Sequence, residues 1–194
     1  MRLFAGIAME KDLRNRVAQV LVKCARVRSG VKWVTPDLLH FTVRFFGEVP
    51  EDGSGPLREA LRKAATVTDA FTLEVGGFGA FPDLERPRVL FASVLRGREP
   101  MRLLAEALAL STATLGFPPP EETFHPHLTL GRVKTGQGIR EAVRELSEVV
   151  PAHLGKMKAE RLTLFESRLA PEGPSYHNLD EFPLVSGGNN PIDS

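Results

Sequence analysis

His40-Phe41-Thr42-Val43 recurs 87 residues further along the chain as His127-Leu128-Thr129-Leu130. The same shift aligns residues 2–7 (RLFAGI) with residues 89–94 (VLFASV). Between these segments, apolar residues recur at helical spacing in both halves. Each half is therefore predicted to run strand, helix and His-containing strand, which is the pattern of an internal duplication.

The sequence after each His strand repeats a second pattern. Helical spacing covers residues 57–64 in the first half and 139–150 in the second. Alternating, β-rich segments follow at residues 71–75 and 160–165, and residues 174–182 could complete a hairpin. We predict a duplicated α+β unit packed about a pseudo-twofold axis, with equivalent strands facing each other across a central cleft.

Turn-forming residues predict where the two halves join and where the domain ends. Residues 76–79 (GGFG) and Pro82-Asp83 indicate turns between the halves. Residues 186–194 are rich in Gly and Asn and are expected to form a flexible tail. We therefore expect one bilobal domain over residues 1–185.

Composition limits the class of protein. The chain has 194 residues, 42% of them hydrophobic and 25% charged, and a single cysteine, Cys24. It has no apolar run near the roughly 20 residues of a membrane span and no signal-peptide layout, so we expect a cytoplasmic protein without disulfides or a membrane anchor. The net charge of +1 argues against a protein that coats duplex nucleic acid. The first 48 residues nevertheless carry a charge of +5, which could attract an anionic substrate or simply form a solvated face.

The paired His-x-Thr segments predict a chemistry. Side chains at positions i and i+2 of a strand share a face, so each segment presents an imidazole beside a hydroxyl. Phosphodiester hydrolysis needs a base, an acid and donors to the phosphate oxygens, and two histidines with two threonines supply all of these without a metal or cofactor. The alternative is that both histidines are half-buried structural residues satisfied by backbone carbonyls.

The sequence resembles the two-histidine phosphoesterase superfamily, and within it the bacterial and archaeal RNA 2′,3′-cyclic phosphodiesterases, often labelled 2′-5′ RNA ligases. The matching stretches span almost the whole chain: residues 39–48 (LHFTVRFFGE), 86–92 (RPRVLFA), 126–132 (PHLTLGR), and 167–169 (SRL) with 174–184. The resemblance implies a bilobal fold of two antiparallel sheets with outer helices. It also implies hydrolysis of a 2′,3′-cyclic phosphate on RNA to a 2′-phosphate, with His40 as the acid and His127 as the base.

Further residues are candidates for contacting the substrate. The resemblance gives Arg132 a role at the substrate, although its odd offset from His127 needs a backbone irregularity, which Gly131 could supply as a bend. Phe45 is the counterpart of Arg132 in the repeat, and its ring could stack on a base or belong to the core. Trp33 is expected to pack under the first His strand. His125 invites a metal-site interpretation, but no Cys or carboxylate lies at ligand spacing.

Other functions remain open at this point. The chain could act on a 2′-5′ linkage or another nucleotide cyclic phosphate, run the reverse ligation, or bind RNA ends without reacting. The expected partner is RNA with a 2′,3′-cyclic phosphate terminus, such as a single-stranded end or a tRNA fragment. We expect a monomer that binds no metal.

Overall fold

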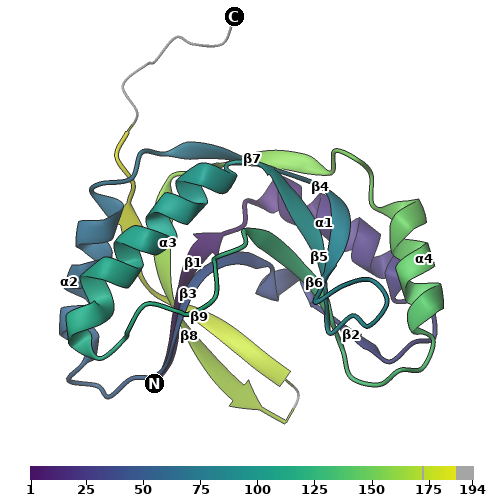
Figure 1. Ribbon diagram of the computed structural model, residues 1–194, viewed down its shortest axis with the longest axis horizontal. Coiled ribbons are helices and arrows are strands. Elements are labelled where there is room, and N and C mark those ends of the chain that lie inside the picture. The colour runs from purple at the N-terminus through teal and green to yellow at the C-terminus, as the bar shows by residue number, and fades with distance from the viewer. Residues whose placement is uncertain (172, 187–194) are drawn as a thin grey trace, which may run out of the picture.

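The computed structural model describes residues 1–171 and 173–186 and contains two antiparallel sheets between two pairs of helices (Figure 1). The strands are β1 (Arg2–Ala8), β2 (Val31–Trp33), β3 (His40–Glu48), β4 (Phe71–Phe81), β5 (Val89–Arg96), β6 (His127–Val133), β7 (Gly155–Ala159), β8 (Arg161–Ala170) and β9 (Gly173–Pro183). The helices are α1 (Lys11–Cys24), α2 (Ser54–Ala65), α3 (Arg98–Thr112) and α4 (Ile139–Val149), with short 3₁₀ turns η1 (Pro36–Leu38) and η2 (Ala113–Leu115). The predicted α+β class is confirmed.

Each sheet is assembled from both halves of the chain. The four-stranded sheet has the order β3-β1-β8-β9, and the five-stranded sheet has the order β2-β6-β5-β4-β7. In the four-stranded sheet β1 of the first half thus pairs with β8 of the second half, while in the five-stranded sheet β5 and β6 of the second half pair with β4 and β2 of the first. This interleaving supports the proposal that residues 1–185 form one folding unit, since neither half contains a complete sheet.

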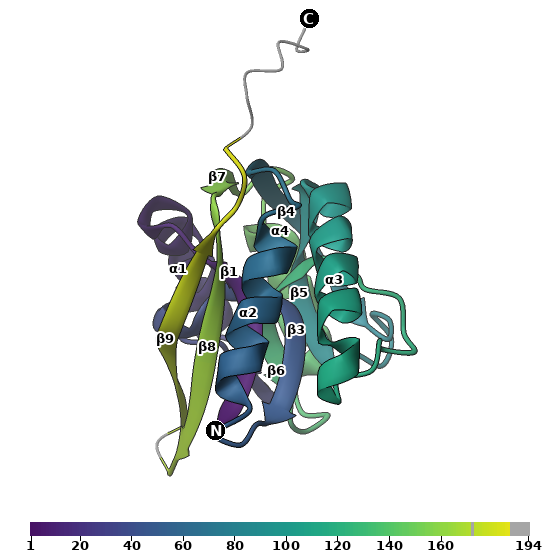
Figure 2. The same ribbon diagram turned by 90° about the vertical axis from the view of Figure 1, so that its left-hand side faces the viewer.

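The helices are exchanged in the same way. α2 and α3 pack against each other and cover the four-stranded sheet, as Figure 2 shows from the side. α1 and α4 contact each other and pack on β7 and β4 of the five-stranded sheet. Each helix buries one apolar stripe, as the periodicity predicts; in α1 the buried residues are Leu13, Val17, Val20, Leu21 and Cys24.

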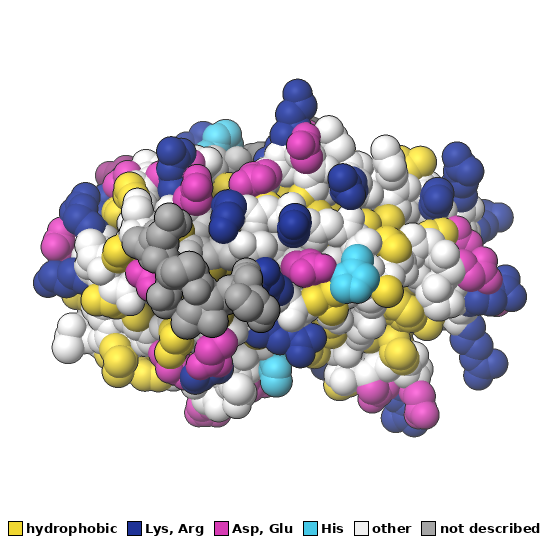
Figure 3. Space-filling model, turned by 90° about the horizontal axis from the view of Figure 1, so that it is seen from above, with side chains coloured by type: hydrophobic (Ala, Val, Ile, Leu, Met, Phe, Trp, Pro, Cys, Tyr) yellow, Lys and Arg dark blue, Asp and Glu magenta, His cyan; other side chains and the backbone are white. Residues whose placement is uncertain are grey.

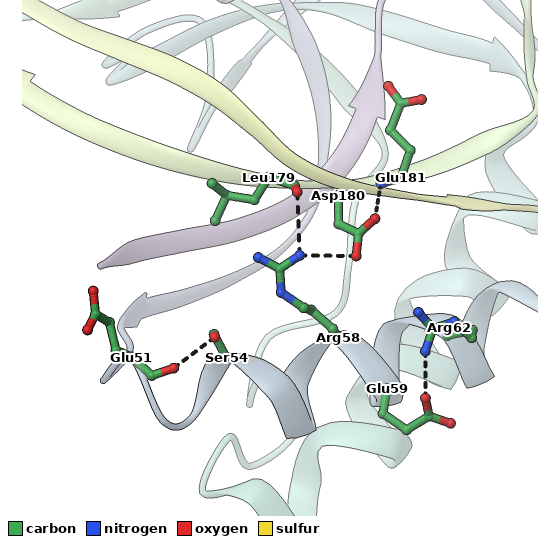
Figure 4. Close-up of polar contacts among 8 residues, drawn as sticks. All are labelled: Glu51, Ser54, Arg58, Glu59, Arg62, Leu179, Asp180 and Glu181. Atoms are coloured by element: carbon green, nitrogen blue, oxygen red, sulfur yellow. Dashed lines mark hydrogen bonds and ion pairs between the residues drawn. The ribbon is translucent and has the colours of Figure 1, made fainter.

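The hairpin of β8 and β9 is tied to the helix layer by an arginine on α2. Arg58 donates through Nη1 to the Oδ2 of Asp180 at 3.0 Å and, more weakly, to the carbonyl of Leu179 at 3.4 Å (Figure 4). Both partners of the ion pair are about one-third exposed. The contact fixes β9 against α2, and β9 is the strand that carries Tyr176 toward the cleft.

Residues 76–79 do not form a turn, because they lie inside β4. Gly77 has a φ of +58° at an irregularity in the β4–β5 pairing, and a Cβ on Gly76 would lie 1.9 Å from the carbonyl oxygen of Ala152. These glycines therefore serve a bulge and a close approach within a strand. Pro82-Asp83 does begin the bend between β4 and β5, where Asp83 accepts hydrogen bonds from two backbone amides.

Trp33 was expected to pack under the first His strand. It lies instead on β2, beside Gly131 of the second His strand. The expected flexible tail over residues 186–194 falls outside the described residues, except for Ser186. Among the described helices, none is both long and apolar enough to cross a membrane.

Candidate active site

The two His-x-Thr segments lie at equivalent places in the two sheets. β3 pairs with β1, where His40 faces Ala8, and β6 pairs with β5, where His127 faces Ser93. The two His strands are also in contact with each other. His40, Thr42 and Thr129 line one pocket of about 370 Å³ between the sheets, and this pocket is large enough for a nucleotide-sized ligand. His127 is not part of its lining.

Both imidazoles are held through the same ring nitrogen. The Nδ1 of His40 lies 2.7 Å from the carbonyl oxygen of Leu38, and the Nδ1 of His127 lies 2.7 Å from the carbonyl oxygen of His125. A carbonyl only accepts, so each Nδ1 carries a proton and donates it. In the neutral ring, Nε2 is then the free base. Each histidine thus has Nε2 as its reactive nitrogen.

His40 and Thr42 are also joined directly. The Nε2 of His40 lies 2.8 Å from the Thr42 hydroxyl oxygen. While the imidazole is neutral, the hydroxyl must donate to Nε2. Once Nε2 is protonated it donates instead, and the hydroxyl hydrogen of Thr42 becomes available to another acceptor.

Aromatic rings support both imidazoles. His40 lies 4.8 Å from the ring of Phe4 and meets Tyr176 edge-on at 5.1 Å. His127 lies 4.9 Å from Phe81 and 5.4 Å from Phe91. Phe4 and Phe91 are equivalent under the 87-residue shift, so the duplication includes the ring beneath each histidine. A Cβ on Gly79 would lie 2.6 Å from the ring of Phe91, so this glycine makes room for that support.

A β-bulge in each His strand brings the residue five positions after the histidine onto the cleft face. In the β1–β3 pairing the register skips Val43, and in the β5–β6 pairing it skips Leu130. These two positions are 87 residues apart. Beyond each bulge, the extra residue reverses which side chains of the strand face the cleft. Phe45, 62% exposed, and Arg132 therefore both line the pocket. The irregularity expected near Arg132 is present, but it is a bulge at Leu130 rather than a bend at Gly131.

Burial and positive charge make both histidines weak bases. Burial is the largest cause of a lowered pKa for each, and the nearby Arg132 guanidinium lowers both further, against the raising effect of the Nδ1 hydrogen bonds. His127 also lowers the pKa of His40, so the two rings are close enough to interact electrostatically. Arg132 also acts on Tyr176, whose pKa is raised by burial. A negatively charged ligand would offset the positive charge of Arg132 beside these groups.

Comparison with known proteins agrees with this geometry. Residues 11–169 match the family model described as the 2′-5′ RNA ligase superfamily. The chain belongs to this superfamily. A relative named RNA 2′,3′-cyclic phosphodiesterase from Aeropyrum pernix is 32% identical, over 90% of this chain and 98% of its own. Another with the same name, from Archaeoglobus fulgidus, is 34% identical over 94% of this chain and 99% of its own.

Solved structures share the fold of this chain. The crystal structure of TT0787 of Thermus thermophilus matches with a TM-score of 0.80 at 30% identity, covering 97% of this chain and 100% of that one. E. coli LigT complexed with 3′-AMP matches with a TM-score of 0.74 at 23% identity, covering 95% and 98%. The two-lobed fold implied by the sequence resemblance is confirmed.

None of the three other histidines lines the pocket. His153 is exposed and pairs with Glu74 at 2.8 Å, and His177 contacts Ser175 on β9. His125 contributes its backbone carbonyl to His127, and its exposed ring lies 6.2 Å from Phe81. In the described part of the chain, no three His, Cys, Asp or Glu side chains group together as a metal site would require.

Sequence reasoning did not assign Phe4, Phe91 and Tyr176 to the site. Phe4 and Phe91 were detectable, because they occupy matching positions in the aligned segments at residues 2–7 and 89–94. Tyr176 carries no such signal, since only the pairing of β9 with β8 brings it to His40.

The lowered pKa values predict an acidic optimum for the free enzyme. Acid-base catalysis by a pair of histidines needs one neutral and one protonated imidazole, so with His40 and His127 in these roles the bell-shaped profile of kcat/KM should be centred below pH 6.5. A bound phosphodiester anion stabilises the imidazolium, so the profile of kcat should lie at higher pH. Arg132→Met should move the kcat/KM profile upward, because it removes a charge that lowers both pKa values. Steady-state rates across pH 4–9 test this, and a wild-type kcat/KM profile centred above pH 7 would contradict it.

Proposed function

We propose that the protein hydrolyses the 2′,3′-cyclic phosphate at the end of an RNA to a 2′-phosphate, using His40 and His127 as general acid and base. The observation that carries the proposal is the duplicated arrangement of the two imidazoles. Each is anchored through Nδ1 to a backbone carbonyl, is supported by an aromatic ring, and stands beside a threonine on the same strand face. The names of the relatives from Aeropyrum pernix and Archaeoglobus fulgidus support the same reaction.

The reaction needs two proton transfers on opposite sides of phosphorus. Water attacks phosphorus in line with the 3′ oxygen and loses a proton to one imidazole. The bond between phosphorus and the 3′ oxygen breaks, and the 3′ oxygen takes a proton from the other imidazole. The products are a 2′-phosphate and a 3′-hydroxyl, and proton exchange with solvent restores both histidines. Following the family resemblance, we assign His127 as the base and His40 as the acid.

The threonines and Arg132 act on the phosphate oxygens. Thr129 lines the pocket and can donate to a non-bridging oxygen. Thr42 can do so only when His40 is protonated, because its hydrogen otherwise goes to Nε2. His40 in its acid form thus frees the Thr42 donor, so protonation and phosphate binding favour each other. The Arg132 guanidinium adds positive charge beside both imidazoles.

Hydrolysis is expected to survive chelation of divalent ions. The acid, the base and the phosphate donors are all side chains of this chain, so no step of the proposed reaction requires a metal. An RNA ending in a 2′,3′-cyclic phosphate should be converted to a 2′-phosphate equally fast in excess EDTA, with the phosphate position read by 31P NMR. Abolition by EDTA with rescue by a divalent ion would refute the mechanism, and a 3′-phosphate product would reverse the choice of leaving group.

A further inference from the structure

Three cationic side chains line one side of the pocket, on and next to the strands β2 and β6 of the five-stranded sheet. Lys32 of β2 lies directly opposite Arg132 of β6 in the strand register, and Lys134 follows Arg132 by two residues. All three line the pocket that holds His40, Thr42 and Thr129. We call Lys32, Arg132 and Lys134 the cationic edge.

The cationic edge is not balanced by acidic side chains. Like charges directly opposite each other on neighbouring strands destabilise a sheet. The described residues that line the pocket include no carboxylate, and none of the ion pairs in residues 1–171 and 173–186 involves a member of the cationic edge. On the face seen in Figure 3, by contrast, acidic and basic side chains are interspersed. An anionic ligand would relieve the repulsion.

The Lys32 ammonium points across the cleft toward the other sheet. A Cβ built on Gly173, the first residue of β9, would have the Nζ of Lys32 as its neighbour at 3.9 Å. β9 belongs to the four-stranded sheet, so Lys32 spans from one sheet toward the other. Its charge therefore lies inside the cleft, where a ligand in the pocket can reach it.

The charge available exceeds what the reacting phosphate needs. A cyclic phosphodiester carries one negative charge, and the site already offers it two imidazoles, two hydroxyls and Arg132. Lys32 and Lys134 add two further positive charges to the lining of the pocket. Trp33 follows Lys32 on β2, and Trp33, Phe45 and Tyr176 line the same pocket, so the pocket offers flat apolar surfaces as well as cations.

We propose that Lys32 and Lys134 bind a second phosphate, the one on the 5′ side of the terminal nucleotide. The inference rests on the proposed function, because it takes the terminal cyclic phosphate to sit at His40 and His127. It makes the cationic edge a specificity site: substrates that carry a 5′ phosphate, including every RNA chain, are favoured over a lone nucleoside 2′,3′-cyclic phosphate.

The test compares three substrates in the wild-type protein and in Lys32→Met/Lys134→Met. They are adenosine 2′,3′-cyclic phosphate, the same compound with a 5′-phosphate, and the dinucleotide adenylyl-(3′→5′)-adenosine 2′,3′-cyclic phosphate. In the wild-type protein, kcat/KM should be roughly tenfold higher for the two substrates with the additional phosphate. The double variant should lose most of that advantage, chiefly through KM. For the dinucleotide, the fall of log(kcat/KM) with log[salt] should also become shallower.

The control variant is Lys63→Met/Lys156→Met, which removes one lysine from α2 and one from β7, the edge strand opposite β2 in the five-stranded sheet. This variant should keep the full preference for substrates with the additional phosphate. Lys32→Arg/Lys134→Arg should keep it as well, while Lys32→Glu/Lys134→Glu should abolish it, with circular dichroism confirming the fold of each variant. If all three substrates react equally fast in the wild-type protein, or if the advantage persists in both the methionine and the glutamate variants, the second phosphate site is wrong and the proposed function stands. If none of the three reacts, the proposed function itself fails.

Discussion

Replacing His40 or His127 with alanine is expected to slow hydrolysis of a 2′,3′-cyclic phosphate by about 10²- to 10⁴-fold in each case. In the proposed mechanism each imidazole performs one proton transfer, so the loss of either ring removes one of the two proton transfers that the reaction needs. Rates under single-turnover conditions measure the effect on the chemical step. The thermal midpoint of unfolding should be recorded beside them, because both rings contact aromatic neighbours.

The matched control is His153→Ala. His153 is exposed and pairs with Glu74 at the surface, so its loss should leave the rate unchanged. The variant His40→Ala/His127→Ala should be slowed by less than the product of the two single effects, since residues that act as one unit are not additive. Near-wild-type activity of either single variant would show that its histidine has no part in proton transfer.

Removing the threonine hydroxyls has the second largest expected effect. Thr42→Val and Thr129→Val should each slow turnover by about 30- to 800-fold, which corresponds to one well-aligned donor worth on the order of 2 to 4 kcal/mol. Thr42→Ser and Thr129→Ser retain the hydroxyl and should recover most of the rate. Thr42→Val should in addition alter the pH profile, because it removes the hydrogen bond to Nε2 of His40.

Thr66→Val serves as the control for this series, since Thr66 only caps the exposed end of α2. Full activity in Thr42→Val/Thr129→Val would rule out a role for the hydroxyls at the phosphate. Equal losses in the valine and serine variants would point to packing rather than to hydrogen bonding.

The local patterns predicted the elements but not the way in which they combine. Helical spacing and alternation depend on neighbours in sequence, so they identified α1, α2, α3 and α4 and the hairpin of β8 and β9. Whether a strand joins its own half or the other one is decided by long-range burial, which leaves no local pattern. The interleaving of β4 with β5, and of β8 with β1, therefore came only from the structure.

Only those residues of the candidate site that recur in both halves of the duplication could be predicted from the sequence. His40, Thr42, His127 and Thr129 follow from the two-residue period of a strand, and the shift of 87 residues relates Phe45 to Arg132. The bulges at Val43 and Leu130 could not be predicted, because an extra residue in one strand is defined by its partner strand. For the same reason residues 76–79 were misread as a turn, since glycine serves turns and bulges alike.

The assignment of acid and base is tested most directly with a substrate whose 3′ oxygen is replaced by sulfur. A thiolate leaves with little need of a proton, so loss of the acid should matter far less than loss of the base. With this substrate, His40→Ala should recover much of its lost rate and His127→Ala should not. Equal rescue of both variants would contradict the partition of roles between the two histidines, and rescue of His127→Ala alone would show that the substrate binds in the opposite orientation.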